Sequence, residues 1–537
     1  MVLTLHRYIL RELVRVFGVA AVALTMMLSL GSILRPVQEY GVGPRQVVHL
    51  ICYSLPIMLT FVLPIAALFA ASLVYGRFAS DNELDACRAS GISLLTLIYP
   101  GLALAIIVAV ANLVLSFHVM PVFVHRAQRA LKADAKQILF RNIKRKGYYK
   151  LPPEEHYLIY ADLASPQTDT LLGVVVVEVE GGVIDRITTA ERAMIHFNPH
   201  RRFNEVQITA YNTYQMDAKG SLSLGLSSFT AEFGSLLGDD IKFKKLNEMR
   251  KIRDVDLTLF DPIAKLARRV HAQLTAELLA QDITARIRSV ADNFYKLHSG
   301  HRFVEFSAAE CSVSKEKQVE LRGNVVVVEY DAVSKQYLRT LLCEEALLYI
   351  EGDELAPTLT MELYKPAWQQ AGRQISTAAG RLRIRGLIIP QAVKDLTSEF
   401  RTENSLKAGE LASQPLMQHY ESGSKLEVLQ RSLQQKIQKT LAEIEAETHS
   451  RLVFGIGCIT VVLIGIGLGI IFKGGHLLSA FGASCVPAAV LIVCIMMGKN
   501  IAKNLGSEAF SGTVLMWAGV IFLSLFAAVL YRKLLKN

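Results

Sequence analysis

Six stretches of the chain are long and apolar enough to cross a membrane. A hydrocarbon core about 30 Å thick needs roughly 20 apolar residues of helix. The windows that meet this condition are Val16–Leu34, Leu50–Tyr75, Ile92–Phe117, Leu452–Phe472, Leu477–Gly498 and Gly512–Tyr531. We interpret the first as a retained span, because it is too long for a signal-peptide core and lacks a small-residue cleavage site. The pattern predicts three spans on each side of a polar middle region.

The middle region changes from helical periodicity to alternation. Short β-rich runs separated by Gly, Pro, Asn and Asp begin at Tyr157 and predict an antiparallel sandwich or jelly roll. Helical spacing interrupts them over Asp261–Leu297, and a second β-rich block runs from Phe303 to about Ile389. A charged helix over Lys425–Arg451 then leads into the fourth window.

Basic residues in the short connections orient the chain. They are Arg7, Arg11 and Arg15 before the first span, Arg77 and Arg88 between the second and third, and Arg532, Lys533 and Lys536 after the last. All fall on one side, which the positive-inside rule makes cytoplasmic. Lys499 and Lys503 fall on the outer side and disagree with this assignment. The long middle region is expected to face outward, because long loops translocate largely regardless of charge.

The predicted fold class is a polytopic α-helical membrane protein, with its six transmembrane helices arranged 3+3, and a large periplasmic β-jelly-roll-like domain containing a helical insertion. Both termini are expected to face the cytoplasm. The predicted parts are 1–126 (spans one to three, with a cytoplasmic helix at about 80–91), 127–260 (β-jelly-roll-like), 261–300 (helical insertion), 301–424 (second β-rich block), 425–451 (periplasmic helix) and 452–537 (spans four to six).

The polar segment Gly76–Ser93 between spans two and three has the signals of a short helix. Ser80 is a candidate N-cap, with Glu83 three residues later completing a capping box. Acidic residues gather at the start of this helix, Arg88 lies near its end, and Gly91 suits the C′ position. The residues that we expect at the site are Ser80, Asp81, Glu83, Leu84, Arg88 and Gly91. Such a helix could transmit motion from a soluble partner, or it could simply be a capped connection.

Arg35 lies at the outer boundary of the first span, directly before Pro36. Its guanidinium could snorkel to the headgroup region or bind an anionic ligand at the membrane surface.

Seven cysteines do not form a disulfide framework, because four fall in spans and Cys87 falls in the cytoplasmic segment. Cys311 and Cys343 form the one outward pair and could bridge in an oxidising compartment, or both could be free thiols.

Motifs for several kinds of chemistry are absent from the sequence. There is no Walker-type phosphate loop, no Gly-x-Ser-x-Gly, no His-Glu-x-x-His and no Cys-x-x-Cys pair. The net charge of +10 fits a membrane protein and does not require nucleic acid. No metal or cofactor is expected. The spans carry almost no ionisable side chains, which argues against an ion relay, so transport would need energy from a partner.

The sequence resembles the LptF/LptG permeases of lipopolysaccharide export. The residues that carry this resemblance are Arg7-Tyr8 and Glu12, Leu55-Pro56 and Leu63-Pro64, Gly76-Arg77, Glu83-Leu84, Arg88 to Ser93, and Glu443 with His449 to Arg451. The order of three spans, β domain and three spans is also similar. The middle region is longer than in that family, and the start of the last span, Ser511 to Trp517, lacks a proline often found there. The second β block faintly resembles the sheet units of the family's bridge proteins.

The resemblance implies several partners. These permeases pair with a paralogous permease, or here with a second copy, on a dimer of a cytoplasmic ABC ATPase. The helix between spans two and three is the family's coupling helix, and its glutamate corresponds to Glu83. A basic residue near the position of Arg35 contacts lipid phosphates. The periplasmic domain passes lipopolysaccharide to β-bridge proteins.

The leading hypothesis is a permease subunit that extracts lipopolysaccharide or a comparable glycolipid from the outer leaflet of the inner membrane. It would not be an enzyme, and ATP hydrolysis would take place in the partner. One alternative is a non-transporting envelope scaffold whose β domain recruits partner proteins. A membrane-embedded glycolipid-modifying enzyme is a third, which the missing catalytic constellation argues against.

Overall fold

The computed structural model describes most of the chain. The described residues are 2–40, 44–133, 135–150, 157–180, 183–198, 204–217, 220–233, 240–289, 294–300, 302–313, 318–332, 334–351, 358–370, 373–376, 381–398, 425–472, 477–503 and 508–536. The chain forms two compact units. The first, helical unit comprises Met1–Ile138, Ser235–Arg253 and Gln438–Asn537, and the second, β-rich unit comprises Leu139–Gly234 and Asp254–Ile437.

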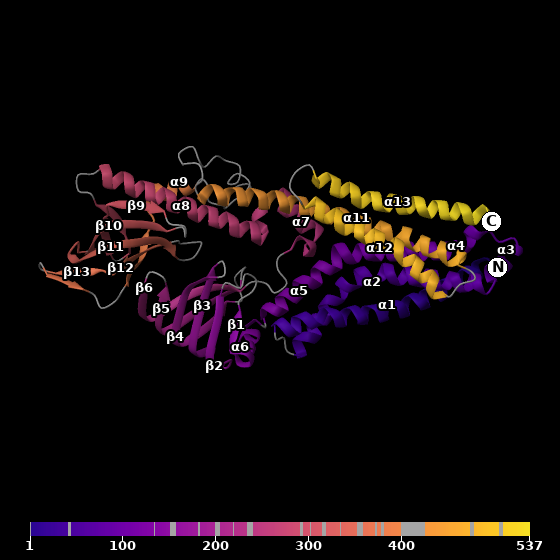
Figure 1. Cartoon of the computed structure of the whole chain (residues 1–537), viewed down its shortest axis with the longest axis horizontal. Coiled ribbons are helices and arrows are strands. Elements are labelled where there is room, and N and C mark those ends of the chain that lie inside the picture. The colour runs from indigo at the N-terminus through magenta and orange to yellow at the C-terminus, as the bar shows by residue number, and fades with distance from the viewer. Residues whose placement is uncertain are drawn as a thin grey trace. The chain divides into compact units, whose positions relative to one another are not determined.

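Six helices of the described chain are long and apolar enough to cross a membrane, as the sequence predicts. They are α1 (Val2–Tyr40), α2 (Pro44–Ser80), α4 (Leu94–Val114, continued by the π-helix η1, Leu115–Val119, and by α5, Met120–Ala133), α11 (Lys425–Ile471), α12 (Leu477–Ala502) and α13 (Glu508–Lys536). Most helices extend beyond the apolar windows, because polar residues continue the backbone hydrogen bonding on either side. The short helix α3 (Glu83–Ala89) lies at the same end of the helical unit as the start of α1 and the end of α13 (Figure 1).

Glycines let the helices of this unit approach closely. On α11, an added Cβ at Gly465 or Gly469 would collide with α2, at Leu68 and at the Ser72 carbonyl respectively, and one at Gly467 would meet Leu530 of α13. The run from Gly465 to Gly469 is therefore a helix-packing face, which is the role that small residues have between membrane helices.

A further close contact joins α12 to α13 and gives the first prediction. A Cβ at Gly512 would lie 2.5 Å from the Ala502 nitrogen and still closer to the Gly498 carbonyl oxygen. Because both neighbours are backbone atoms, we expect Gly512→Ala to destabilise the protein by roughly 1–3 kcal/mol. Gly482→Ala in α12 is the control, since its Cβ would meet nothing within 4 Å. Thermal unfolding in detergent measures the difference, and equal unfolding midpoints for the two variants would contradict the prediction.

The first part of the β unit is a six-stranded antiparallel meander. Its strands lie in chain order: β1 (Tyr148–Lys150), β2 (Tyr157–Ser165), β3 (Thr170–Glu180), β4 (Val183–Asn198), β5 (Asn204–Asp217) and β6 (Gly220–Phe233). The helix α6 (Ala135–Lys146) precedes it. This confirms a β domain after the third span, whereas the expected jelly-roll detail is not confirmed, because neighbours in the sheet are also neighbours in sequence.

Helices separate the meander from a second sheet. They are η2 (Ile241–Phe243), α7 (Leu246–Asp254), η3 (Leu257–Leu259) and α8 (Asp261–Ser289). The second sheet contains β7 (Tyr295–His298), β8 (Arg302–Ser307), β9 (Glu310–Val313), β10 (Val319–Asp331), β11 (Tyr337–Glu351), β12 (Thr358–Tyr364), β13 (Ala367–Gln370), β14 (Arg373–Ser376) and β15 (Arg381–Ile388), and α9 (Gln391–Ser398) follows.

The second sheet curls back on itself. Pairing runs from β7 through β8, β10, β11 and β12 to β15, and a bridge between Ser299 and Leu387 joins the two ends of this order. Leu279 and Ile283 of α8 belong to the same buried cluster as Phe306 and Val327 of the sheet. Side chains of α8 and the strands therefore fill the inner face.

Cys311 and Cys343 are free thiols, so the disulfide considered above is not formed. Cys311 of β9 pairs with Leu321 of β10, whereas Cys343 of β11 pairs with Val325 on the opposite edge of β10. Two strands on either side of a third lie roughly 9–10 Å apart, and a disulfide needs Cα atoms within about 7 Å. Burial also raises the pKa of the Cys311 thiol to about 11, which keeps it protonated and unreactive.

Candidate functional site

The helix α3 begins differently from the prediction. Helix α2 continues through Ser80, whose hydroxyl donates to the Arg77 carbonyl at 2.9 Å. The N-cap of α3 is Asn82, in the left-handed conformation with φ of 58° and without a side-chain capping bond. The expected capping box between Ser80 and Glu83 is therefore wrong, because an N-cap residue needs a non-helical backbone and Ser80 is still helical.

The end of α3 agrees with the prediction. Gly91 has a φ of 83°, its N–H donates to the Arg88 carbonyl, and the Ile92 N–H donates to the Cys87 carbonyl. This pair of bonds is a Schellman motif with Gly91 at C′.

Gly91 gives the second prediction. An alanine Cβ there would meet nothing within 4 Å, so Gly91→Ala changes backbone strain and not packing. We expect it to weaken the end of α3 by roughly 1–2 kcal/mol, and Gly91→Asn to weaken it less, because asparagine tolerates the left-handed region better. Hydrogen exchange of the α3 amides measures this, and equal exchange in both variants would contradict it.

One side chain anchors α3 to the helical unit. Leu84 is the buried residue of α3, and its cluster includes Ile9 and Leu13 of α1, Phe78 of α2 and Leu97 of α4. Leu84 therefore places α3 in a buried cluster to which α1, α2 and α4 all contribute.

The charged side chains of the candidate site lie at the surface. Asp81, Glu83, Asp85 and Arg88 are all exposed. Arg77, at the end of α2, bonds Glu12 of α1 at 3.2 Å and lies 4.0 Å from Asp81. The arrangement presents an acidic first turn on a firmly anchored helix, which suits a soluble partner with basic side chains. Arg35 falls within α1, but its side chain lies outside the described residues.

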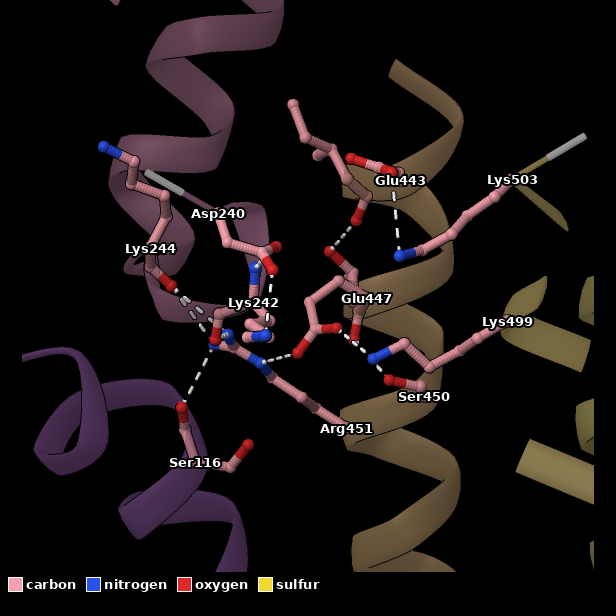
Figure 2. A network of polar contacts seen from close by, with 12 residues as sticks. Ser116, Asp240, Lys242, Lys244, Glu443, Glu447, Ser450, Arg451, Lys499 and Lys503 are labelled. Atoms are coloured by element: carbon pink, nitrogen blue, oxygen red, sulfur yellow. Dashed lines mark hydrogen bonds and ion pairs between the residues drawn. The ribbon is translucent and has the colours of Figure 1, made fainter. Parts of the chain in front are cut away.

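A buried polar network that the sequence did not predict lies within the same helical unit (Figure 2). At its centre, the Arg451 guanidinium bonds the Glu447 carboxylate at 2.9 Å, the Ser116 carbonyl at 3.0 Å and the Lys242 carbonyl at 2.8 Å. Two longer bonds reach the Lys244 carbonyl, and the side chain is 3% exposed. Arg451 thus joins α11 to the π-helix η1 and to η2. Its fork of five N–H donors fits this set of acceptors.

Glu447 extends the network to α12. Its second carboxylate oxygen accepts from Lys499 at 2.5 Å, while one turn earlier Glu443 lies 3.6 Å from Lys503. Each of the two lysines that depart from the charge pattern expected from the sequence therefore has an acidic partner on α11. A buried carboxylate between two cations is retained because each cation offsets its desolvation.

Two carboxylates near the network have low pKa values. Burial alone would raise the pKa of Asp240, but hydrogen bonds from the Lys242 side chain and backbone hold it below its ordinary value. Burial likewise opposes ionisation of Glu248, yet hydrogen bonds from His125 of α5 and from the Lys245 N–H lower its pKa to about 2. Glu248 therefore stays ionised at neutral pH and ties α7 to α5.

A sequence signal for this network existed. Glu447 and Arg451 have the i,i+4 spacing of a helical ion pair, and Lys499 and Lys503 were anomalous in the charge pattern. The carbonyl partners from Ser116, Lys242 and Lys244 could not be inferred, since backbone acceptors leave no trace in side-chain patterns.

Comparison with known proteins gives one family. The model for the lipopolysaccharide export system permease LptF/LptG matches residues 7–280 and 378–533. It leaves out 281–377, which holds the last turns of α8 and the strands β7 to β14. No curated protein matches the chain significantly. Because the family model covers most or all of each of the six candidate spans, together with α3 and the first sheet, the chain belongs to the LptF/LptG family of lipopolysaccharide export permeases.

Proposed function

We propose that the chain is the permease subunit of an ABC-type export complex that extracts lipopolysaccharide from the outer leaflet of the inner membrane. Family membership is the observation that carries the proposal. Under this proposal the complex also contains a cytoplasmic ATPase dimer, which supplies the nucleotide-binding motif that this sequence lacks. A second permease, either a paralogue or another copy of this chain, completes the membrane part.

Under this proposal α3 is the coupling helix, with Glu83 contacting the ATPase. The exposed acidic turn supports it, as does the Leu84 anchor, which would carry a displacement of α3 into α1, α2 and α4. Both termini and α3 face the cytoplasm, in line with the basic residues at that end. The β unit lies in the periplasm and passes lipid to bridge proteins, and Arg35 contacts lipid phosphate.

Purification in mild detergent tests the proposal. An ATP-hydrolysing subunit should remain bound to the full-length protein, and lipopolysaccharide should stimulate hydrolysis. A stable complex with envelope proteins but no such subunit would favour the alternative, a non-transporting scaffold whose β domain recruits partners. The Glu83→Ala variant then asks whether the ATPase docks at α3.

A further inference from the structure

A groove of about 510 Å³ lies on the membrane-spanning part of α1, and one of its lining residues, Glu12, pairs with Arg77 near α3. Val16 and Leu24 of α1 and Phe69 of α2 line it together with other small or apolar residues. The two charged lining residues are Glu12 and Arg15, both toward the beginning of α1. The volume lies in the range of small-molecule sites.

The groove has the length of one lipid leaflet. The charged residues come first along α1, and the lining then continues without charge from Val16 to Leu24. Leu24 lies nine positions after Arg15, a rise of roughly 13 Å at about 1.5 Å per residue. Half of a hydrocarbon core of about 30 Å is roughly 15 Å. An acyl chain that begins at a headgroup beside Arg15 would therefore fit along the groove.

The charges at the groove favour an anion. The Glu12 carboxylate is already held by Arg77 at 3.2 Å. Arg15 is exposed and, within the described part of the chain, has no ion pair. A guanidinium binds phosphate through two parallel N–H bonds. An apolar helix of a second permease would cover this cation without neutralising it, at a cost in desolvation.

We propose that the groove binds an anionic glycerophospholipid of the cytoplasmic leaflet, with one acyl chain along Val16 to Leu24 and the phosphate on Arg15. The leaflet assignment rests on the orientation in the proposed function. This lipid is distinct from the cargo, which comes from the outer leaflet. Its headgroup adjoins the Glu12–Arg77 pair, and Arg77 in turn lies beside Asp81 at the start of the turn into α3. The site thus places the negative charge of the lipid phosphate next to the coupling helix.

Photocrosslinking tests the site in the full-length protein as purified with its partners. The probe is phosphatidylglycerol with a photoreactive acyl chain, in vesicles of phosphatidylcholine. We expect labelled peptides between residues 12 and 24. Arg15→Gln should lower the labelling about tenfold, as expected for the loss of a charge-assisted contact. Ala23→Phe should lower it comparably by filling the groove, because Ala23 is exposed and can take a larger side chain without disturbing the core.

Arg11→Gln is the matched control, because Arg11 is exposed on the same helix but does not line the groove. Its labelling should stay within twofold of the unmodified chain. Equal labelling in the Arg11 and Arg15 variants would overturn the site. Crosslinks from this segment to a second permease, or to photoreactive lipid A instead of phosphatidylglycerol, would assign the groove to those occupants and overturn it too.

A separate measurement distinguishes this proposal from the function proposed above. The thiol of Arg15→Cys, read apart from the native cysteines by peptide mass spectrometry, should resist a membrane-impermeant maleimide applied from the periplasmic side. Labelling from that side would place the groove in the wrong leaflet, even where the ATPase remains bound. Loss of the ATPase with phosphatidylglycerol crosslinking intact would instead count against the proposed function alone.

Discussion

Glu83→Ala is expected to leave expression and folding intact while uncoupling the permease from its ATPase. Glu83 is exposed in the first turn of α3, and removing its side chain changes neither the Leu84 anchor nor the Gly91 motif. Truncating one partner of an interfacial charge pair costs about 2–5 kcal/mol. We therefore expect at least a tenfold loss of retained ATPase on purification, and a comparable loss of lipid export.

Two further variants separate charge from position. Glu83→Gln keeps the size of the side chain, so an equal loss would assign the effect to the charge. Leu84→Ala removes the buried anchor and should destabilise α3 by about 2–5 kcal/mol, which lowers coupling and also raises hydrogen exchange of the α3 amides. Unchanged lipid export in Glu83→Ala would remove Glu83 from the coupling role.

The sequence predicted the spans because membrane burial acts on composition alone. Any uncharged run of sufficient length can be recognised as a candidate span from its composition. The six apolar windows of the sequence therefore correspond to six helices of the structure. The start of α3 was missed for a local reason. The Ser80–Glu83 spacing fits a capping box, but α2 runs through Ser80, and the chain turns at Asn82 instead, in a left-handed conformation. Sequence spacing cannot tell the last turn of one helix from the first turn of the next.

In the β unit, the strands could be predicted from the sequence but their order in the sheets could not. Alternation predicted strands in both blocks, but strand order depends on partners far apart in sequence. The closure of the second sheet through Ser299 and Leu387 and the packing of α8 into its inner face carry no local signal. The pairing of Cys311 and Cys343 was undecidable from sequence for the same reason, since one intervening strand, β10, determines their separation.

Glu447→Ala should have the largest effect on stability. It leaves the Arg451 guanidinium, which is 3% exposed, and the partly buried Lys499 ammonium without their shared carboxylate. Breaking a buried ion pair by removing one partner costs about 3–5 kcal/mol, because the remaining charge is buried uncompensated. The loss should release α12 from α11, and Arg451 should also bind less firmly to the carbonyls of η1 and η2. With Trp368 of β13 replaced by Phe, the fluorescence of Trp517 is a local reporter, since its indole N–H bonds His449 of α11 at 3.4 Å.

Glu443→Ala is the matched control one turn earlier on α11. Its pair with Lys503 is longer, at 3.6 Å, and the lysine is 36% exposed, so its loss should cost only about 0–1 kcal/mol. The midpoint temperature of thermal unfolding, followed by Trp517 fluorescence, should therefore fall sharply for Glu447→Ala and little for Glu443→Ala. A further Lys499→Met change in the Glu447 variant removes one uncompensated charge and should recover part of the loss. Equal unfolding of the two single variants would mean that water already solvates Arg451 and Lys499, and the network would then be a surface ion pair with no role in holding α12.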